Sequence, residues 1–434
     1  MRMRIILASL LLLTSFWPAH AQSHAAPDPL ASILVKAGRM LDVRKGAYLD
    51  NVDILIEGDR IKEVGPASQI ELHAPKDVKT IDLSHATVLP GLIDCHTHLM
   101  ARFASGPDGY LLGLAKKSQA FRALEGAADA RVTLQAGFTT VRDVENEGSD
   151  YADVALRDAI NQGLVDGPRM QVATRAIAAV GQYNPFGVSP DVVDFPAGAQ
   201  MVSGAEEARR AAREQIGNGA DLIKVYADWN YPTLTVEEMS AIVEEAHKAG
   251  LKVAAHATTP DGIRNALKAG VDSIEHGHRA DRQAIEIMKA KGVFLVPTVA
   301  GIDADIKSMG PNDLTPVQRK RFDAFVQGTY DEVATAKKLG VKIASGSDAS
   351  GAKEHGKNAV ELESMVKRGL TSLEAIQAAT INAAELMNWQ DRVGALEDGK
   401  FADLIAVDGD PLQDITVLQH VSFVMKGGAV IKSN

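Results

Sequence analysis

Between residues 90 and 388, short apolar segments alternate with stretches of helical periodicity, and this alternation constrains the fold of the 434-residue chain more than any other feature. Such alternation is typical of βα units around a parallel sheet. The apolar segments give eight candidate strands, at 88–96, 139–144, 170–174, 222–226, 253–256, 273–276, 293–299 and 342–346. Eight strands favour a closed, TIM-like (β/α)8 barrel over an open doubly wound sheet, because no Gly-x-Gly-x-x-Gly turn follows the first strand.

The two ends of the chain lack helical periodicity and instead indicate short strands and turns, at 31–88 and at 402–426. Neither piece has enough apolar surface to form a core alone. We therefore predict an α/β protein in which both ends join into one small β-sandwich-like domain beside the barrel. The expected divisions are a signal peptide, a barrel and a two-part β-domain, at 1–21, at 89–388, and at 22–88 with 389–434.

The first residues have the features of an export signal. Two arginines precede a short apolar stretch at 5–17, and Ala19-His20-Ala21 offers a small-x-small cleavage pattern. The apolar stretch is shorter than the roughly 18 residues that cross a bilayer. We expect cleavage before Gln22 and an exported protein that is periplasmic or secreted.

Charge and cysteine content exclude several classes of partner and linkage. The chain has 46 Lys and Arg against 56 Asp and Glu, a net charge of −10. An acidic balance argues against nucleic-acid or anionic-membrane partners, which need a basic face. Cys95 is the single cysteine, so an internal disulfide is impossible. We expect a homo-oligomer that acts on a small molecule and binds neither nucleic acid nor membrane.

Polar residues lie at or near the carboxyl ends of five candidate strands, which is the face where barrel enzymes build their active sites. They are His96, His98, Lys224, His256, His276 and Asp348. Because residues i and i+2 of a strand share a face, His96 and His98 can coordinate the same ion. Imidazole and carboxylate ligands suit Zn²⁺ or a similar transition metal. Each residue alone has a structural explanation, such as a buried ion-pair partner or a turn, but the shared position favours a metal site.

Several blocks of the sequence resemble the metal-ligand motifs of the amidohydrolase superfamily. The blocks are Gly91-Leu92-Ile93-Asp94-Cys95-His96-Thr97-His98, Ile223-Lys224-Val225-Tyr226, Ala255-His256-Ala257, Ile274-Glu275-His276-Gly277 and Gly346-Ser347-Asp348, with Gly399-Lys400-Phe401-Ala402-Asp403-Leu404 near the C-terminus. The Lys-x-Tyr strand is similar to that of the prolidase-like and ochratoxinase-like branch. That branch cleaves peptide or N-acyl amino acid amides.

The resemblance implies a binuclear site with two divalent ions, for which we expect Zn. His96, His98 and Asp348 would hold one ion, His256 and His276 the second, and Lys224, carboxylated by CO₂, would bridge them. A hydroxide shared by two such ions attacks the substrate carbonyl. Asp348 would accept the proton of this hydroxide and transfer it to the leaving nitrogen.

Signals for substrate binding are weaker. Tyr226 and His278 follow Lys224 and His276 at i+2 spacing and can meet the substrate, although packing and support of a ligand are the alternatives. Arg142 is a candidate for a carboxylate-binding cation, with an ion pair as its alternative. The segment 181–187 is a candidate active-site loop, but it lacks the glycine-rich, histidine-containing segment of many relatives. His355 is expected to be a solvated loop histidine.

These observations predict a metal-dependent hydrolase that cleaves dipeptides of prolidase type or N-acyl amino acids such as ochratoxin. A mononuclear deaminase or cyclic-amide hydrolase is the alternative enzyme, and Lys224 discriminates because a single metal needs no bridging carbamate. An exported metal- or solute-binding protein is the alternative of another class.

Overall fold

The structure is a computed structural model that describes residues 32–433 except 104–108, 184–187, 190, 193, 230 and 311–312. The predicted signal peptide lies outside the described residues, as does part of the predicted active-site loop. Within the described ranges, no helix is both long and apolar enough to cross a membrane.

The described chain begins with strands β1 to β4, interrupted by one short helix, and then alternates strands and helices. The strands are β1 (Ser32–Asp42), β2 (Ala47–Glu57), β3 (Arg60–Pro66), β4 (Lys79–Pro90), β5 (Leu92–Thr97), β6 (Phe138–Asp143), β7 (Arg169–Val172), β8 (Ala176–Ala179), β9 (Ala199–Val202), β10 (Leu222–Tyr226), β11 (Lys252–Ala257), β12 (Ser273–His276), β13 (Phe294–Val296), β14 (Leu404–Val407), β15 (Phe423–Lys426) and β16 (Ala429–Ser433). The helices are α1 (Ala67–His73), α2 (Gly109–Lys116), α3 (Gln119–Gln135), α4 (Ala152–Asn161), α5 (Ala205–Gly217), α6 (Val236–Lys248), α7 (Pro260–Ala269), α8 (Arg282–Lys291), α9 (Ala300–Ser308), α10 (Pro316–Leu339), α11 (Val360–Lys367), α12 (Ser372–Ala378), α13 (Ile381–Leu386) and a 3₁₀ helix, η1 (Ile415–Gln419).

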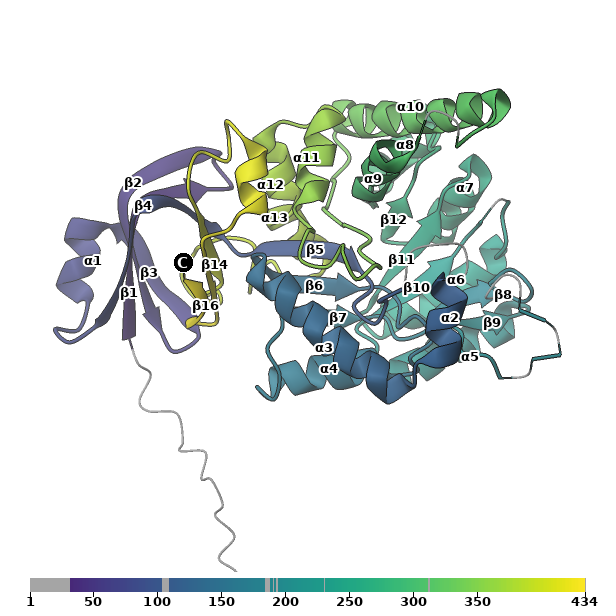
Figure 1. Cartoon of the computed structure of the whole chain (residues 1–434), viewed down its shortest axis with the longest axis horizontal. Coiled ribbons are helices and arrows are strands. Elements are labelled where there is room, and N and C mark those ends of the chain that lie inside the picture. The colour runs from purple at the N-terminus through teal and green to yellow at the C-terminus, as the bar shows by residue number, and fades with distance from the viewer. Residues whose placement is uncertain are drawn as a thin grey trace, which may run out of the picture.

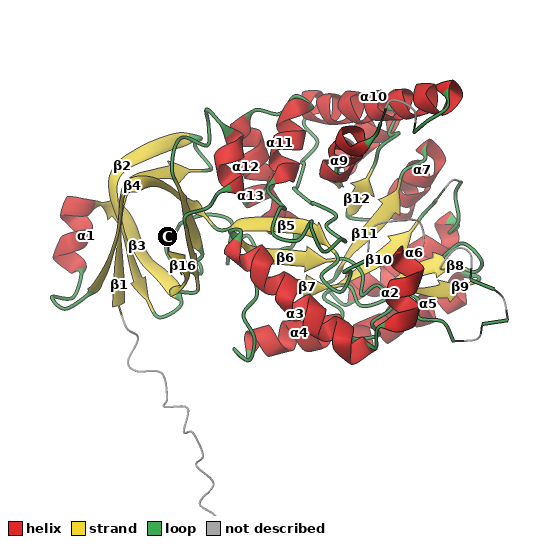
Figure 2. Ribbon diagram, in the orientation of Figure 1, coloured by secondary structure: helices red, strands yellow, loops and turns green. Residues whose placement is uncertain are grey.

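The central strands form a barrel with the helices outside it (Figure 2). Strands β5, β6 and β7 are parallel neighbours, and so are β10, β11, β12 and β13. The N–H of Asp221, just before β10, donates to the Val172 carbonyl of β7 at 2.8 Å, which joins the two groups. Residues 342–349 fill the gap between β13 and β5. The Ala344 N–H donates to Leu295 O at 2.9 Å, and the Cys95 N–H donates to Ser345 O at 2.8 Å. The barrel therefore closes with eight positions, as the sequence predicts.

Three details differ from the predicted strands. The segment 88–96 is divided at Gly91 into β4 and β5. At Gly91 the backbone passes so close to β6 that a Cβ would lie 2.2 Å from Thr139 Oγ1. Residues 342–346 occupy the eighth position with one isolated bridge, Leu295 to Ile343, rather than a regular strand. The pair β8 and β9 adds to the sheet beside β10 and was not expected, because Ala-Ile-Ala-Ala gives little strand signal.

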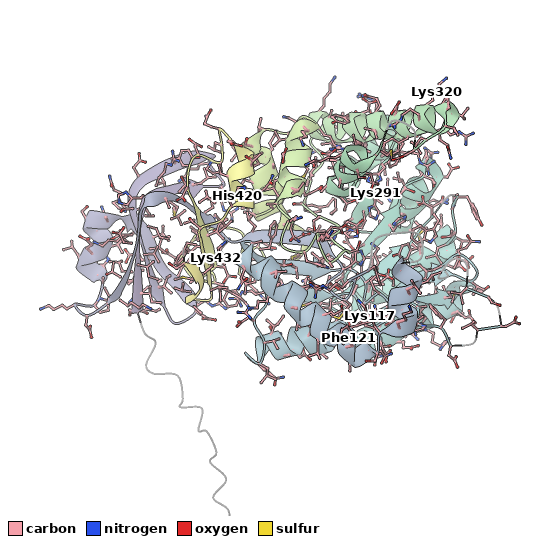
Figure 3. The ribbon with its side chains drawn as sticks, in the orientation of Figure 1. Lys117, Phe121, Lys291, Lys320, His420 and Lys432 are labelled. Atoms are coloured by element: carbon pink, nitrogen blue, oxygen red, sulfur yellow. The ribbon has the colours of Figure 1, made fainter. Side chains whose placement is uncertain are left out.

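Strand alternation places the chemistry inside the barrel. In β10, Ile223 and Val225 join the large apolar core that the surrounding helices share, whereas Leu222 packs against Ala254 in the interior. Lys224 and Tyr226 share the face of Leu222, because alternate side chains point the same way. The helices shield this interior, and charged residues such as Lys291 and Lys320 lie on their outer surface (Figure 3).

A seven-stranded sheet combines both ends of the described chain, in the order β16-β15-β14-β4-β1-β2-β3. Figure 1 shows the purple N-terminal strands beside the yellow C-terminal strands, at one side of the barrel. β1 pairs with β4 in parallel, and β14 pairs with β4 antiparallel, with Ala406 opposite Val88. Arg169 of β7 ties the sheet to the barrel through an ion pair with Asp403 at 2.8 Å.

Candidate metal centre

The structure brings the four predicted histidines and Asp348 to one end of the barrel. His96 lies in β5 and His98 directly after it, His256 lies near the end of β11, and His276 ends β12. Ring centroids lie 5.3 Å apart for His96 and His98, 5.0 Å for His96 and His276, and 4.5 Å for His256 and His276. Asp348 follows the eighth barrel segment and lies 3.2 Å from His98, between Asp348 Oδ1 and His98 Nε2.

One subset of this cluster has the geometry of a metal-binding group. His96, His98 and Asp348 each offer a ligand atom, and these atoms all lie within 4.8 Å of one another. His96 Nε2 is buried and has no hydrogen-bond partner in the described part of the chain. A buried nitrogen without a partner is costly unless something satisfies it, and a divalent cation would do so. The donor set therefore fits a metal ion.

The backbone holds Asp348 in an uncommon conformation. Its φ is +56°, and its N–H donates to the His96 carbonyl at 2.8 Å. Asp94 fixes the preceding residue by accepting the Ser347 N–H at 3.0 Å, and Asn358 donates to the other Asp94 oxygen at 2.8 Å. A positive φ in a residue other than glycine persists only where surrounding bonds enforce it, and such residues concentrate at functional sites.

His256 and His276 form the other half of the cluster. His276 Nδ1 lies 2.7 Å from Thr298 Oγ1 and 3.9 Å from Asp348 Oδ2. Burial lowers the pKa of both imidazoles well below the usual range; in His256, the charge of Lys224 lowers it further. Both rings are therefore neutral at pH 7, which is the form of histidine that binds metals.

Lys224 lies among these side chains in the barrel interior. It is 1% exposed, and no carboxylate lies within 4.0 Å of its Nζ among the described residues. Burial lowers its pKa from the usual value, because the charged ammonium is poorly solvated there. The lysine therefore loses its proton more readily at this position than it would on the protein surface.

Glu275 supports His96 and was not identified from the sequence. Its Oε2 lies 2.7 Å from His96 Nδ1, and its Oε1 accepts a hydrogen bond from Arg142 at 2.7 Å. Arg142 is 1% exposed and also donates to Ser273 Oγ and to the Cys95 carbonyl. Each nitrogen of Arg142 thus donates to a buried protein group, which favours the ion-pair alternative over binding of a substrate carboxylate.

Two further acids follow β6 and also went unrecognised. Glu147 Oε1 lies 3.0 Å from His98 Nδ1, and Glu145 accepts hydrogen bonds from the hydroxyls of Tyr183 and Tyr226. Burial and the neighbouring Glu147 raise the pKa of Glu145 to about 7. Although burial opposes it, Asp348 and Glu147 hold the pKa of His98 well above its usual value. The only signal for Glu145 and Glu147 in the sequence was their position just after an apolar strand.

The predicted substrate contacts are mostly engaged with protein groups. Tyr226 is 5% exposed, and its hydroxyl is held by Glu145. His278 Nε2 lies 3.0 Å from the Pro297 carbonyl, and its ring packs edge-on against Phe325. His355 is buried and bonds to the Ala101 carbonyl at 2.9 Å, so the expectation of a solvated histidine was wrong.

A cavity of about 450 Å³ extends from Asp348 between α9 and the loop that follows the eighth barrel segment. We call it the α9 cavity. Its lining residues are Ala300, Gly301, Ala304, Asp305, Ser347, Asp348, Ala349, Ser350, Lys353, Glu354, Lys357, Asn358 and Val360. Asp348 thus has one side towards the histidines and another towards open space.

Known proteins resemble this chain along nearly its whole length. An ochratoxinase from Aspergillus niger is 32% identical over 447 residues, which cover 94% of this chain and 88% of the relative. The crystal structure of a Xaa-Pro dipeptidase with bound methionine in its active site has a TM-score of 0.82 and 35% identity, covering 92% of this chain and 99% of the other. A prolidase complexed with N-methylphosphonate-L-proline has a TM-score of 0.81 and 32% identity, covering 93% and 100%.

The family profile agrees with these relatives and with the barrel. The profile of the amidohydrolase family matches residues 87–431, which include the barrel and the strands β14, β15 and β16. The match also spans every residue of the histidine cluster. The chain belongs to the amidohydrolase family and is a hydrolase that acts on amide bonds.

Proposed function

We propose that this enzyme is metal-dependent and cleaves the amide bond that joins an acyl group to an amino acid, in a dipeptide or an N-acyl amino acid. The observation that carries the proposal is the buried, unpartnered His96 Nε2 beside His98 and Asp348. The relatives support the substrate class. One is a Xaa-Pro dipeptidase with methionine in its active site, one is a prolidase with a proline phosphonate, and one is an ochratoxinase.

The cluster can hold two divalent ions. His96, His98 and Asp348 would hold one, and His256 with His276 the second. Imidazole nitrogens and carboxylate oxygens are typical Zn²⁺ ligands. Bound ions would supply a water activated near neutral pH and polarise the substrate carbonyl.

Lys224 is suited to become the anionic ligand between the two halves of the cluster. Its neutral amine would attack CO₂, forming a nitrogen–carbon bond and releasing one proton, and the carbamate would carry two oxygen donors. The burial of Lys224, its lowered pKa and the absence of an ion pair in the described ranges all support this modification. An ammonium has no lone pair to offer a metal.

Asp348 is the proton carrier in this proposal. Its side chain is 37% exposed, whereas those of His96, His98 and His276 are at most 9% exposed. Burial would raise the pKa of Asp348, but His96 and His98 hold it well below its usual range, so the carboxylate is ionised at neutral pH. It can therefore accept a proton from the attacking water and deliver it to the leaving nitrogen across the α9 cavity.

The test is a hydrolysis screen of metal-loaded enzyme against N-acyl amino acids and Xaa-Pro dipeptides, read by mass spectrometry. We expect release of the free amino acid from at least one group, and loss of that release in Asp348→Asn. A folded, metal-loaded enzyme that cleaves none of these amides would overturn the proposal.

A further inference from the structure

None of the three predicted substrate-binding residues offers a free cation to the substrate carboxylate. Arg142 forms an ion pair with Glu275, and the Tyr226 hydroxyl donates a hydrogen bond to Glu145. His278 is buried, and its Nε2 lies 3.0 Å from the Pro297 carbonyl. A carboxylate removed from water needs a compensating charge or hydrogen-bond donors. Donors for the carboxylate must then come from other residues around Asp348.

Bond lengths limit where the carboxylate of a leaving amino acid can lie. In an α-amino acid the carboxyl carbon is only roughly 2.5 Å from the nitrogen, across two covalent bonds. If Asp348 protonates that nitrogen, the carboxylate must lie in space adjoining Asp348. The α9 cavity is a described space that adjoins it. A cation that recognises the carboxylate is thus expected in the walls of this cavity.

Lys353 and Lys357 are the only cations among the described residues that line the α9 cavity. Both are exposed, and neither forms an ion pair within the described part of the structure. The cavity also contains two acids besides Asp348. Glu354 is engaged, because its Oε2 accepts the backbone N–H groups of Ser350 at 3.0 Å and Gly351 at 2.8 Å. Asp305 lies on α9, across from the lysine-bearing loop.

We propose that Lys353 and Lys357 form the carboxylate-binding subsite of the enzyme, selecting substrates whose leaving group is an amino acid with a free carboxylate. This inference rests on the proposed function and names the part of the substrate that the α9 cavity receives. Each ammonium can donate up to three hydrogen bonds from a flexible stem, so the two can converge on one carboxylate. The subsite then lies on the loop that also carries Asp348.

The test compares Lys353→Gln, Lys357→Gln and the double variant with wild type. The substrates are an N-acyl amino acid cleaved by the wild type and its methyl ester, and release of the amino acid or its ester is measured. We expect the double variant to raise KM for the free acid about tenfold, the effect of losing a charge-assisted hydrogen bond, with kcat within about twofold. KM for the ester should not change. Lys307→Gln is the matched control, because Lys307 is exposed on α9 but does not line the cavity.

Two results would overturn the subsite. One is a double variant with wild-type KM for the acid, and the other is an equal rise in KM for acid and ester, which indicates a change of shape rather than loss of charge. Failure of the proposed function is recognised separately, as a wild type that cleaves no amide. In that case, calorimetric binding of N-benzoyl-phenylalanine decides the subsite. Weaker binding by the double variant supports it, and equal binding, or none by the wild type, rejects it.

Discussion

Glu275 shows how one residue can determine the state of a metal ligand. Burial alone would raise the pKa of Glu275, but Arg142 and His96 lower it to about 2, so the carboxylate stays ionised. It therefore accepts a hydrogen bond from the N–H of His96 Nδ1, which leaves the lone pair of His96 Nε2 available to a metal ion. The ion pair with Arg142 fixes the carboxylate in turn.

Replacing Glu275 with glutamine should weaken metal binding while keeping the shape of the side chain. The amide loses the negative charge that orients His96 and compensates Arg142, so we expect metal affinity to fall about 10- to 100-fold. A titration against a competing chelator measures this. Glu286→Gln, on the exposed face of α8, is the control and should leave affinity unchanged. Wild-type affinity in Glu275→Gln would remove Glu275 from the support of the site.

Lys224 gives the sharpest test of the bridging carbamate. Lys224→Ala should reduce metal content and rate together, because the bridging anion is lost. Acetate or propionate at high concentration should restore part of the rate by occupying the vacated position. Lys224→Arg should stay inactive, because a guanidinium neither takes up CO₂ nor binds a metal. An active Lys224→Arg enzyme with full metal content would contradict the bridging role.

At the scale of elements, the eighth barrel segment combines closure of the barrel with placement of Asp348. Gly346 permits both, because a Cβ there would lie 2.5 Å from Val296 Cγ1 and 2.6 Å from His96 Cβ. The segment therefore passes against β13 and β5 more closely than a residue with a side chain allows.

Gly346→Ala should displace this segment and with it Asp348. We expect destabilisation of about 1–3 kcal/mol, as for other overpacked cores, and a lower metal affinity. Chemical denaturation and metal titration measure the two effects. Gly217→Ala in α5, where a Cβ would meet nothing within 4 Å, is the control and should not weaken metal binding. Unchanged stability and affinity in Gly346→Ala would show that the close passage is not required.

The sequence predicted the barrel because its signal is local. Short apolar segments alternate with helical spacing along the chain, so seven predicted strands match observed strands at the same places. The eighth predicted strand is not a regular strand in the structure. Residues 342–346 are held in place by hydrogen bonds to β13 and β5 rather than by their own strand preference. The pair β8 and β9 was missed because small residues carry little pattern.

The ligand candidates were visible in the sequence, but their support was not. His96 and His98 are found by i+2 spacing, and strand ends locate the rest. The partnership of Glu275 with Arg142 joins β12 to β6, and no local pattern reports which strands face each other across a barrel. His355 was placed in solvent for the same reason, because its burial comes from contact with the distant Ala101 carbonyl.

For the molecule as a whole, the metal should contribute to stability. We expect protein purified without chelator to contain about two transition-metal ions per chain, and chelator should lower Tm. Ligands that bind only the folded state stabilise it by about 2.7 kcal/mol at 100 times their Kd. Elemental analysis and scanning calorimetry measure both quantities, and adding Zn²⁺ should restore Tm. One ion or fewer in active enzyme, or an unchanged Tm after metal removal, would contradict the binuclear site.

The pairing of β4 with β14 has a consequence for how the chain acquires its structure. Residues 87–90 pair with 404–407, so the sequence of the whole barrel lies between two neighbouring strands. During synthesis, the edge of β4 that pairs with β14 has no partner strand until the last strands emerge. The sheet and the barrel are therefore finished together, and a chain that stops before β14 should aggregate rather than persist as a free barrel.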